Sequence, residues 1–188
     1  MLDKHRIELL SGLHGRVIEV GCGNGLNFAH YPADVDHVLG VEPESYLREL
    51  AIRAAAASPI DITVVAGMAN ALPADDASVD AVVFSLVLCS VDDHAAALAE
   101  AARVLTPRGE LRFYEHVVSP TARLASVQRG TDVVWPKLFG GCRTACDTVG
   151  SIESAQFTDV DFRRLDLKAG PVPTPVSPHV LGRARLAD

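Results

Sequence analysis

The stretch from residue 16 to residue 26, RVIEVGCGNGL, places the strongest constraint on how this chain can fold. Val17, Ile18 and Val20 form an apolar, β-branched run of the kind that makes a buried strand. The run leads into residues 21–25, GCGNG, whose three glycines permit a tight turn and the close approach of a ligand to the backbone. A strand that enters such a turn and then a helix predicts a nucleotide site at the carboxyl edge of a parallel sheet.

The spacing of the glycines distinguishes two kinds of nucleotide site. The dinucleotide fingerprint G-x-G-x-x-G needs a glycine at position 26, which is Leu26, whereas the third glycine is Gly25. This spacing argues against an NAD-dependent oxidoreductase. The observed E-V-G-C-G-N-G closely resembles the first motif of class I S-adenosylmethionine (SAM) methyltransferases, E/D-x-G-x-G-x-G. The alternative is a glycine turn that merely joins a strand to a helix.

The resemblance implies a role for each residue of this motif. In class I methyltransferases the glycine turn passes under the methionine part of SAM, and the acidic residue helps to place its amino group. We therefore expect the following residues to bind the cofactor: Glu19, Gly21, Cys22, Gly23, Asn24 and Gly25.

A second acidic residue ends the next predicted strand, residues 37–42, HVLGVE. A carboxylate at such a place can accept hydrogen bonds from both ribose hydroxyls, and the acid here does so in class I methyltransferases. We therefore expect Glu42, with Pro43, to bind the ribose of SAM. The alternative is a carboxylate that favours the N-terminus of the following helix, a role that Glu44 could also fill.

Residues 67–73, GMANALP, resemble the adenine loop of the family, G-x-A-x-x-L-P. In that loop, backbone groups and one polar side chain read the adenine edge while an apolar side chain packs on the ring. Met68, Ala69 and Asn70 are therefore expected at the adenine. Many relatives carry Asp in place of Met68, so the contact to the exocyclic amine falls to Asn70 or to the backbone.

Residues 81–91, AVVFSLVLCSV, are too apolar for a surface strand and predict the central strand. In the family, the carboxyl end of this strand lies beside the transferring methyl group. We expect Ser85 and Leu86 at the cofactor and Cys89 at the acceptor, with core packing as the alternative for Leu86. Residues 103–109, RVLTPRG, add the family hallmark R-V-L-x-P-x-G, which leads from a helix into a strand over residues 110–118.

These motifs predict an α/β fold, the Rossmann-like class I methyltransferase sandwich, as a single domain over residues 1–188. The family implies a seven-stranded, mostly parallel sheet with an antiparallel last strand. The first helix either covers the pocket or packs at the sheet edge. Apolar periodicity predicts helices over 3–13, 26–30, 44–57, 120–139 and 144–155, another from Asp92 or Asp93, and strands over 16–20, 61–66, 157–167 and 179–186. Residues 170–178 are expected to be a proline-rich connection.

Four further segments resemble one branch of the family, whose animal members are alkyl-thiol S-methyltransferases. They are 87–91 (VLCSV), 114–117 (YEHV), 135–143 and 177–184 (SPHVLGRA). The resemblance implies a small-molecule acceptor, with a thiol sulfur favoured. O-, N- or C-methylation of a small metabolite, as in quinone-type enzymes, stays open, as does a SAM-binding protein without turnover. The animal proteins begin with a hydrophobic membrane segment that this sequence lacks, so no membrane association is expected.

Methylation of a thiol does not depend on a strong general base. A free thiol has a pKa of about 8.5 and is already partly ionised near neutral pH, so a general base helps but is not required. Glu115 and His116 are the candidate bases, and alternation along a strand lets one of them face the pocket. Trp135 and Arg143 are candidate acceptor contacts, with packing and solvent exposure as the respective alternatives.

Composition narrows the possible partners. A net charge of −7 disfavours a broad nucleic-acid surface, and the apolar runs are too short to span a membrane. With no signal peptide at its start, the chain is expected in the cytoplasm, where its four cysteines would be reduced. It is expected to be a monomer or homodimer. A helix could place Cys142 and Cys146 on one face, but without a second pair of ligands no metal site is expected.

Overall fold

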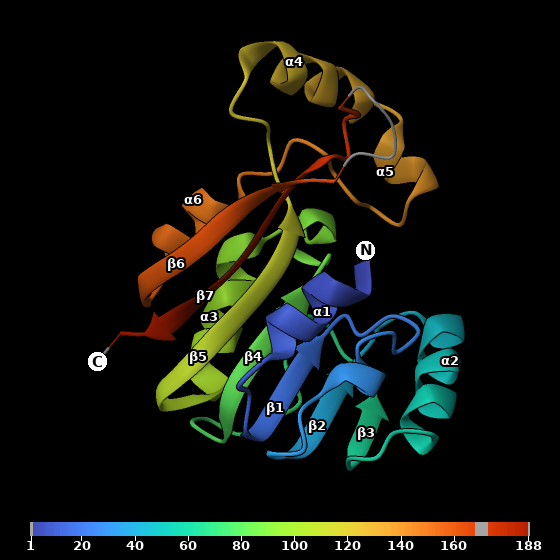
Figure 1. The fold of residues 1–188 in the computed structure, drawn as a ribbon, viewed down its shortest axis with the longest axis vertical. Coiled ribbons are helices and arrows are strands. Elements are labelled where there is room, and N and C mark those ends of the chain that lie inside the picture. Colours follow the sequence, from blue (N-terminus) through green and yellow to red (C-terminus); the bar gives the residue numbers. More distant parts are fainter. Residues whose placement is uncertain (1, 168–172, 188) are drawn as a thin grey trace.

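The computed structural model describes residues 2–167 and 173–187, and its centre is a twisted seven-stranded sheet (Figure 1). The strand order is β3-β2-β1-β4-β5-β7-β6. Six strands run parallel, and β7 runs against its neighbours β5 and β6. The strands are β1 (Gly15–Val20), β2 (Val35–Val41), β3 (Ile62–Val65), β4 (Val79–Ser85), β5 (Leu105–His116), β6 (Phe157–Asp166) and β7 (Pro178–Leu186). This arrangement confirms the predicted fold class.

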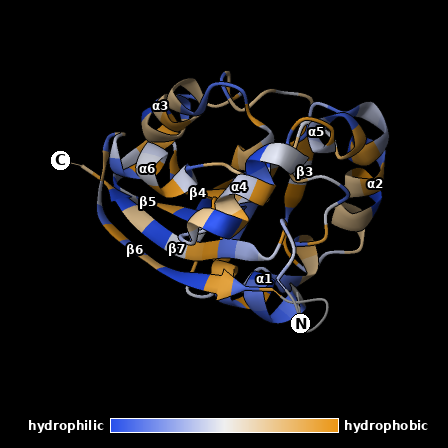
Figure 2. Ribbon diagram, turned by 90° about the horizontal axis from the view of Figure 1, so that it is seen from above, coloured by the Kyte–Doolittle hydropathy of each residue, from blue (hydrophilic) through white to orange (hydrophobic). Residues whose placement is uncertain are grey.

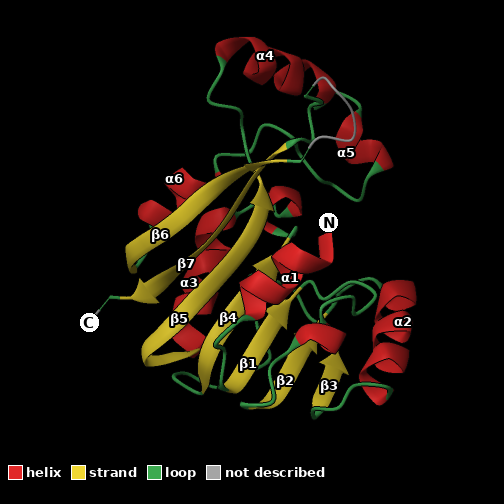
Figure 3. Ribbon diagram, in the orientation of Figure 1, coloured by secondary structure: helices red, strands yellow, loops and turns green. Residues whose placement is uncertain are grey.

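Helices cover both faces of the sheet (Figure 3). Helices α1 (Leu2–Leu10) and α2 (Ser45–Ala56), with the 3₁₀ turn η1 (Phe28–His30), pack on one face, and α3 (His94–Val104) and α6 (Thr148–Glu153) on the other. Along β4, Ala81 and Val83 face the first layer while Val82 and Phe84 face the second. Because both faces are buried, the central strands read as continuous apolar runs. Helix α1 therefore packs on a sheet face, where Arg112 of β5 donates to the carbonyls of Leu9 and Ser11.

Two short helices, α4 (Ala122–Thr131) and α5 (Trp135–Leu138), lie beyond the carboxyl ends of the parallel strands, as the view from above also shows (Figure 2). The prediction of one helix over residues 120–139 was wrong. The carboxylate of Asp132 bonds the backbone N–H groups of Thr144 and Ala145, and Pro136 has no N–H to continue the helical ladder. The helix predicted over 144–155 is shorter too, because the Asp147 side chain caps α6.

The predicted strand over 81–91 was also too long. Strand β4 ends at Ser85, and Leu86 turns the chain with a φ of 62° before the 3₁₀ turn η2 (Leu88–Ser90). Strand β5 follows α3 directly at Leu105, five residues before the start that was predicted for this strand. Part of the connection expected over 170–178 lies outside the described residues. The remaining element ends differ by a few residues from those predicted.

Candidate active site

The glycine turn after β1 is packed against neighbouring side chains at Gly21 and Gly25 and open at Gly23. Gly21, Gly23 and Gly25 have φ angles of 62°, 57° and 79°, a region that disfavours side chains. A Cβ on Gly21 would lie 2.7 Å from the Val87 side chain, and one on Gly25 would lie 2.7 Å from Phe28. A Cβ on Gly23 would meet nothing within 4 Å. The turn is therefore a cradle with room for a ligand directly over Gly23, which fits the methionine part of SAM.

Glu42 lies against this cradle from the end of β2. Its carboxylate is buried and accepts the backbone N–H groups of Gly23 at 2.8 Å and of Glu44 at 3.0 Å. The helix-capping role belongs instead to Glu44, which accepts the N–H groups of Tyr46 and Leu47 at the start of α2. Glu42 is thus free of the cap and stands where the ribose of SAM is expected.

Glu19 lies on the buried side of the turn. Its carboxylate accepts hydrogen bonds from Asn27 Nδ2 and the Tyr31 hydroxyl, both at 2.8 Å. Burial raises the pKa of Glu19 to about 7, and the two hydrogen bonds oppose this shift. Arg6 of α1 extends the network by donating to Asn27 Oδ1 at 2.6 Å. Sequence reasoning missed Asn27 and Tyr31, although polar residues next to a glycine turn and among buried neighbours were a usable signal.

Side chains of α3 form hydrogen bonds to the backbone of the predicted adenine loop. Leu72 donates its N–H to Glu100 Oε2 at 2.8 Å and accepts from Arg103 Nη2 at 3.1 Å. Arg103 also bonds the carbonyl of Ala74. Within the loop, Met68 and Asn70 are exposed and so are available to a ligand. The arginine of the R-V-L-x-P-x-G motif therefore bonds the backbone of the loop in which the adenine contacts are predicted.

The carboxyl ends of β4 and β5 carry polar groups with spare hydrogen-bonding capacity. Ser85 and Tyr114 are register partners in the sheet, and the hydroxyls of both are buried without a partner among the described residues. The Tyr114 ring stacks on His179 and lies 5.8 Å from the ring of His5 in α1. The N-terminal helix thus closes one side of this region, and the unpaired hydroxyls remain available to a bound molecule.

Glu115 and His116 point to opposite sides of β5, as alternation predicted. The fully buried carboxylate of Glu115 accepts the N–H groups of Val87, Leu88 and Cys89, at 2.9, 3.1 and 3.4 Å. Burial raises its pKa to about 7 against those hydrogen bonds. His116 is half-buried, and its Nδ1 lies 3.2 Å from Cys142 Sγ.

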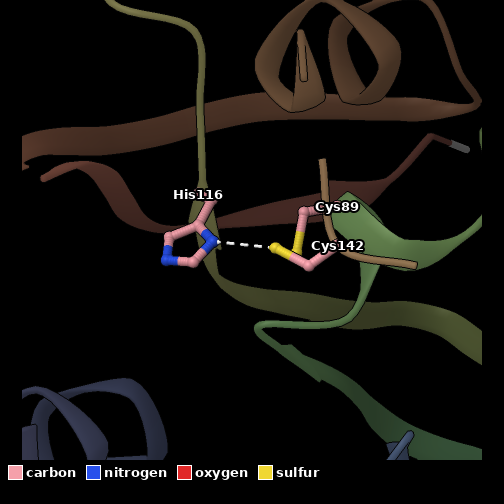
Figure 4. A group of neighbouring side chains, drawn as sticks. All are labelled: Cys89, His116 and Cys142. Carbon is pink, nitrogen blue, oxygen red and sulfur yellow. Dashed lines mark hydrogen bonds between the residues drawn. The ribbon is translucent and has the colours of Figure 1, made fainter. Parts of the chain in front are cut away.

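Three side chains from distant parts of the chain meet beside this strand end (Figure 4). Cys89 of η2, His116 of β5 and Cys142 of the loop after α5 hold their ligand atoms within 4.8 Å of one another. Cys142 and Cys146 do not share a helix, because α6 begins only at Thr148. Cys146 Sγ instead lies 3.6 Å from the carbonyl oxygen of Cys89.

Comparison with known proteins identifies the family. Residues 18–113 match the family described as "Methyltransferase domain". The human protein named thiol S-methyltransferase TMT1B is 34% identical over 188 residues, which cover 95% of this chain and 75% of that protein. The chain is a class I SAM-dependent methyltransferase. Its cofactor is SAM, and its acceptor is a small molecule.

Solved structures support the fold of the methyltransferase. The YcgJ protein from Bacillus subtilis superimposes with a TM-score of 0.79 at 14% identity, covering 99% of both chains. Geranyl diphosphate C-methyltransferase from Streptomyces coelicolor, solved with S-adenosyl-L-homocysteine, gives 0.75 at 16% identity, covering 99% of this chain and 78% of that one. Among its described residues, the methyltransferase has no helix both long and apolar enough to cross a membrane.

The remaining acceptor candidates lie on the same side of the methyltransferase as the Cys89–His116–Cys142 cluster. Trp135 of α5 is half-buried and stacks on Phe139, with ring centroids 3.8 Å apart. Arg143 is exposed, and its guanidinium pairs with Asp92 at 2.5 Å, while its backbone N–H bonds the carbonyl of Cys89 at 2.8 Å. Arg143 therefore joins the loop after α5 to η2 through its backbone.

Sequence reasoning missed Gln128, which anchors α4 over the site. Its side chain is fully buried, and its Oε1 accepts the N–H of Ser119. Its Nε2, with two hydrogens to share, lies 2.7–3.1 Å from three carbonyls, those of Val117, Thr144 and Pro175. One side chain thus ties α4 to the end of β5 and to two later loops. A single glutamine in a helix gives no sequence signal for such a role.

Proposed function

We propose that this methyltransferase transfers the methyl group of SAM to the sulfur of a small thiol. The observation that carries the proposal is the convergence of the segments that resemble the thiol S-methyltransferase branch. Cys89, His116 and Cys142 come one each from segments 87–91, 114–117 and 135–143, and their side chains meet beside the carboxyl ends of β4 and β5. The similarity to human thiol S-methyltransferase TMT1B extends over both halves of the chain and so includes this region.

The place of this region relative to the cofactor supports the proposal. Val87, two residues before Cys89, packs so closely on the glycine turn that a Cβ on Gly21 would lie 2.7 Å from it. The acceptor region therefore adjoins the cradle in which SAM is expected. An acceptor sulfur held here would need little movement to align with the methyl group, and alignment with exclusion of water accounts for much of the acceleration in such displacements.

SAM supplies a methyl group on a positively charged sulfur, and the acceptor thiol must lose its proton. We propose His116 as the residue that takes this proton, because it is half-buried and lies at the end of β5 among the acceptor candidates. Glu115 then acts through the backbone of residues 87–89, whose N–H groups its carboxylate holds. Cys89, Trp135 and Arg143 remain the proposed surroundings of the acceptor.

The cofactor contacts expected from the motifs are proposed as well. The open face of the glycine turn and the buried carboxylate of Glu42 support the first of them. The full set is Glu19, Gly21, Cys22, Gly23, Asn24, Gly25, Glu42, Pro43, Met68, Ala69, Asn70, Ser85 and Leu86. We further propose a single domain over residues 1–188, a monomer or homodimer, a cytoplasmic location and no nucleic-acid partner, the last because of the net charge of −7.

The experiment is a panel of small acceptors incubated with purified protein and SAM. Release of S-adenosyl-L-homocysteine and the mass of the methylated product are measured for alkyl thiols, catechols, quinols and amines. We expect product with the thiols and methylation on sulfur. Product only with the oxygen, nitrogen or carbon acceptors would overturn the thiol proposal. Binding of S-adenosyl-L-homocysteine by calorimetry, without product from any class, would direct the search to other acceptors.

A further inference from the structure

The Cys89–His116–Cys142 cluster has the composition and size of a metal site. Two thiols and one imidazole hold their ligand atoms within 4.8 Å of one another, and His116 Nδ1 lies 3.2 Å from Cys142 Sγ. With metal–ligand bonds of about 2.0–2.3 Å, tetrahedral zinc ligands lie roughly 3.3–3.8 Å apart. Small movements of the side chains would therefore bring all three onto one ion.

The segments that carry the two sulfurs are joined by further contacts. The carbonyl of Cys89 accepts the backbone N–H of Arg143, the residue after Cys142, at 2.8 Å. Cys89 Sγ lies 3.8 Å from the hydroxyl of Ser90. Outer groups of this kind orient the ligands of a metal and support their charge.

The cluster is largely shielded from water. Cys89 is 1% exposed, and Cys142 and His116 are partly buried. Two thiolates side by side would repel each other, so without a cation at least one of them keeps its proton. A divalent cation replaces that proton and neutralises both sulfurs. Among divalent cations, thiolate and imidazole ligands suit zinc better than magnesium or calcium.

Among the residues that the structure describes, three ligands come together in this cluster. Cys146 is not one of these ligands, because its sulfur points to the carbonyl of Cys89. Zinc sites with three protein ligands, including the Cys₂His type, leave the fourth position to water or substrate.

We infer that Cys89, His116 and Cys142 bind Zn²⁺ through two thiolates and one imidazole, with the fourth position open to an exogenous ligand. If the proposed function holds, that ligand is the acceptor thiol. Its S–H bond breaks, the proton leaves to solvent, and the sulfur binds the metal as a thiolate. In methyl transfer a new C–S bond forms on the acceptor while the C–S bond of SAM breaks, and that electron pair stays on the sulfur of S-adenosylhomocysteine. In this arrangement His116 serves as a ligand, in place of the proton acceptor proposed above.

The test is a metal titration of reduced, chelator-treated full-length protein. Zn²⁺ affinity is measured by competition with a chromophoric chelator, and Co²⁺ is used as a spectroscopic substitute. We expect one equivalent of either metal, with the intense visible bands of tetrahedral cobalt and a thiolate-to-cobalt charge-transfer band. Cys142→Ser and His116→Gln should each weaken Zn²⁺ binding by more than the roughly 10–100-fold typical of losing an outer partner.

The matched control is Cys146→Ser, which removes a buried cysteine outside the ligand set. It should keep the metal affinity and the cobalt spectrum. Calorimetry with S-adenosyl-L-homocysteine and thermal unfolding establish that each variant is folded. The inference fails if wild-type protein binds no stoichiometric metal, if Cys142→Ser retains binding, or if Cys146→Ser abolishes it in folded protein. Mass spectrometry without reductant that finds Cys89 joined to Cys142 in the protein as isolated would assign the pair to a disulfide and overturn the metal site.

The experiments can disprove the metal site and the thiol proposal independently of each other. Thiol methylation by protein that holds no metal would overturn the metal site alone. Stoichiometric zinc in a protein that methylates only oxygen, nitrogen or carbon would overturn the thiol proposal and leave the metal site standing.

Discussion

Glu115 accepts the backbone N–H of Val87 at 2.9 Å, and Val87 in turn packs against Gly21 of the cofactor turn. One buried carboxylate on β5 therefore sets the position of the chain between the cofactor cradle and Cys89. The hydrogen bonds to Leu88 and Cys89 extend this hold over three consecutive residues. The position of the acceptor region thus depends on the charge and geometry of a side chain that itself faces the core.

The buried carboxylate of Glu115 should make stability fall as the pH rises. Its pKa is about 7 in the folded protein and about 4.5 in the unfolded chain, so the folded state keeps the proton up to a higher pH. Between these two pH values Glu115 is ionised in the unfolded chain and protonated in the folded protein. Ionisation therefore favours unfolding, at a cost on the order of 3 kcal/mol to folding. Glu115→Gln cannot ionise. Its free energy of unfolding, measured with urea from pH 4.5 to 7.5, should therefore decrease less than that of wild type. The decrease that remains comes from Glu19, whose pKa burial also raises to about 7.

Glu44→Gln is the comparison for this experiment. Hydrogen bonds from the N–H groups of Leu47 and Tyr46 lower the pKa of Glu44. Its contribution to stability is therefore present above its unfolded pKa and is lost as the pH falls. The two variants should change the pH dependence of stability in opposite directions. A Glu115→Gln profile parallel to that of wild type would contradict the buried, raised-pKa state.

Glu42→Gln should weaken binding of S-adenosyl-L-homocysteine. Both carboxylate oxygens accept backbone N–H groups, so an amide would place its NH₂ group against one of these donors and also lose the negative charge expected at the ribose. Hydrogen bonds to charged groups contribute about 1.5–3 kcal/mol, which corresponds to a loss of roughly 10–100-fold in affinity by calorimetry. Glu44→Gln, which removes the neighbouring carboxylate, should bind with unchanged affinity. Equal losses in both variants would contradict the assignment.

Gly23→Ala should weaken binding of S-adenosyl-L-homocysteine beyond what its effect on stability explains. A methyl group there enters the open space over the turn, so we expect an affinity for S-adenosyl-L-homocysteine about tenfold lower or worse. The matched control is Gly12→Ala, since Gly12 has a φ of 77° and equally open surroundings outside the site. Both variants carry similar backbone strain, about 1–2 kcal/mol, in thermal unfolding. Unchanged affinity in Gly23→Ala would show that the cofactor does not lie over this turn.

Gln128→Ala should loosen α4 over the acceptor region. Its loss leaves a buried N–H and three carbonyls without their partner, which predicts destabilisation of about 2–4 kcal/mol in urea unfolding. Arg129→Ala, next to it on the exposed face, should stay within about 0.5 kcal/mol of wild type. In enzyme kinetics, Gln128→Ala should raise KM for the acceptor while leaving the affinity for S-adenosyl-L-homocysteine near that of wild type. A loss of cofactor affinity as large as the change in KM would contradict a role confined to the acceptor side.

The first strand and the glycine turn after it could be predicted from the sequence, because each is built from a short, continuous segment. A β-branched run, a glycine turn and an acid at the next strand end each depend on local backbone geometry. The periodicity of apolar residues failed where distant contacts override it. Residues 120–139 share an apolar helical face, yet Asp132 bonds to Thr144 and the chain turns.

The sequence by itself determined the family, the seven-stranded fold class and the glycine turn after β1, because local conformation and burial on both faces leave few alternatives for such segments. Only the tertiary structure decided that Glu115 faces inward, that His116 faces Cys142, and that Cys142 meets Cys89 and not Cys146. These contacts join residues at least 26 positions apart. Their geometry follows from the turn at Leu86 and the loop after α5, where side-chain direction is set by packing between elements and leaves no periodic trace in the sequence.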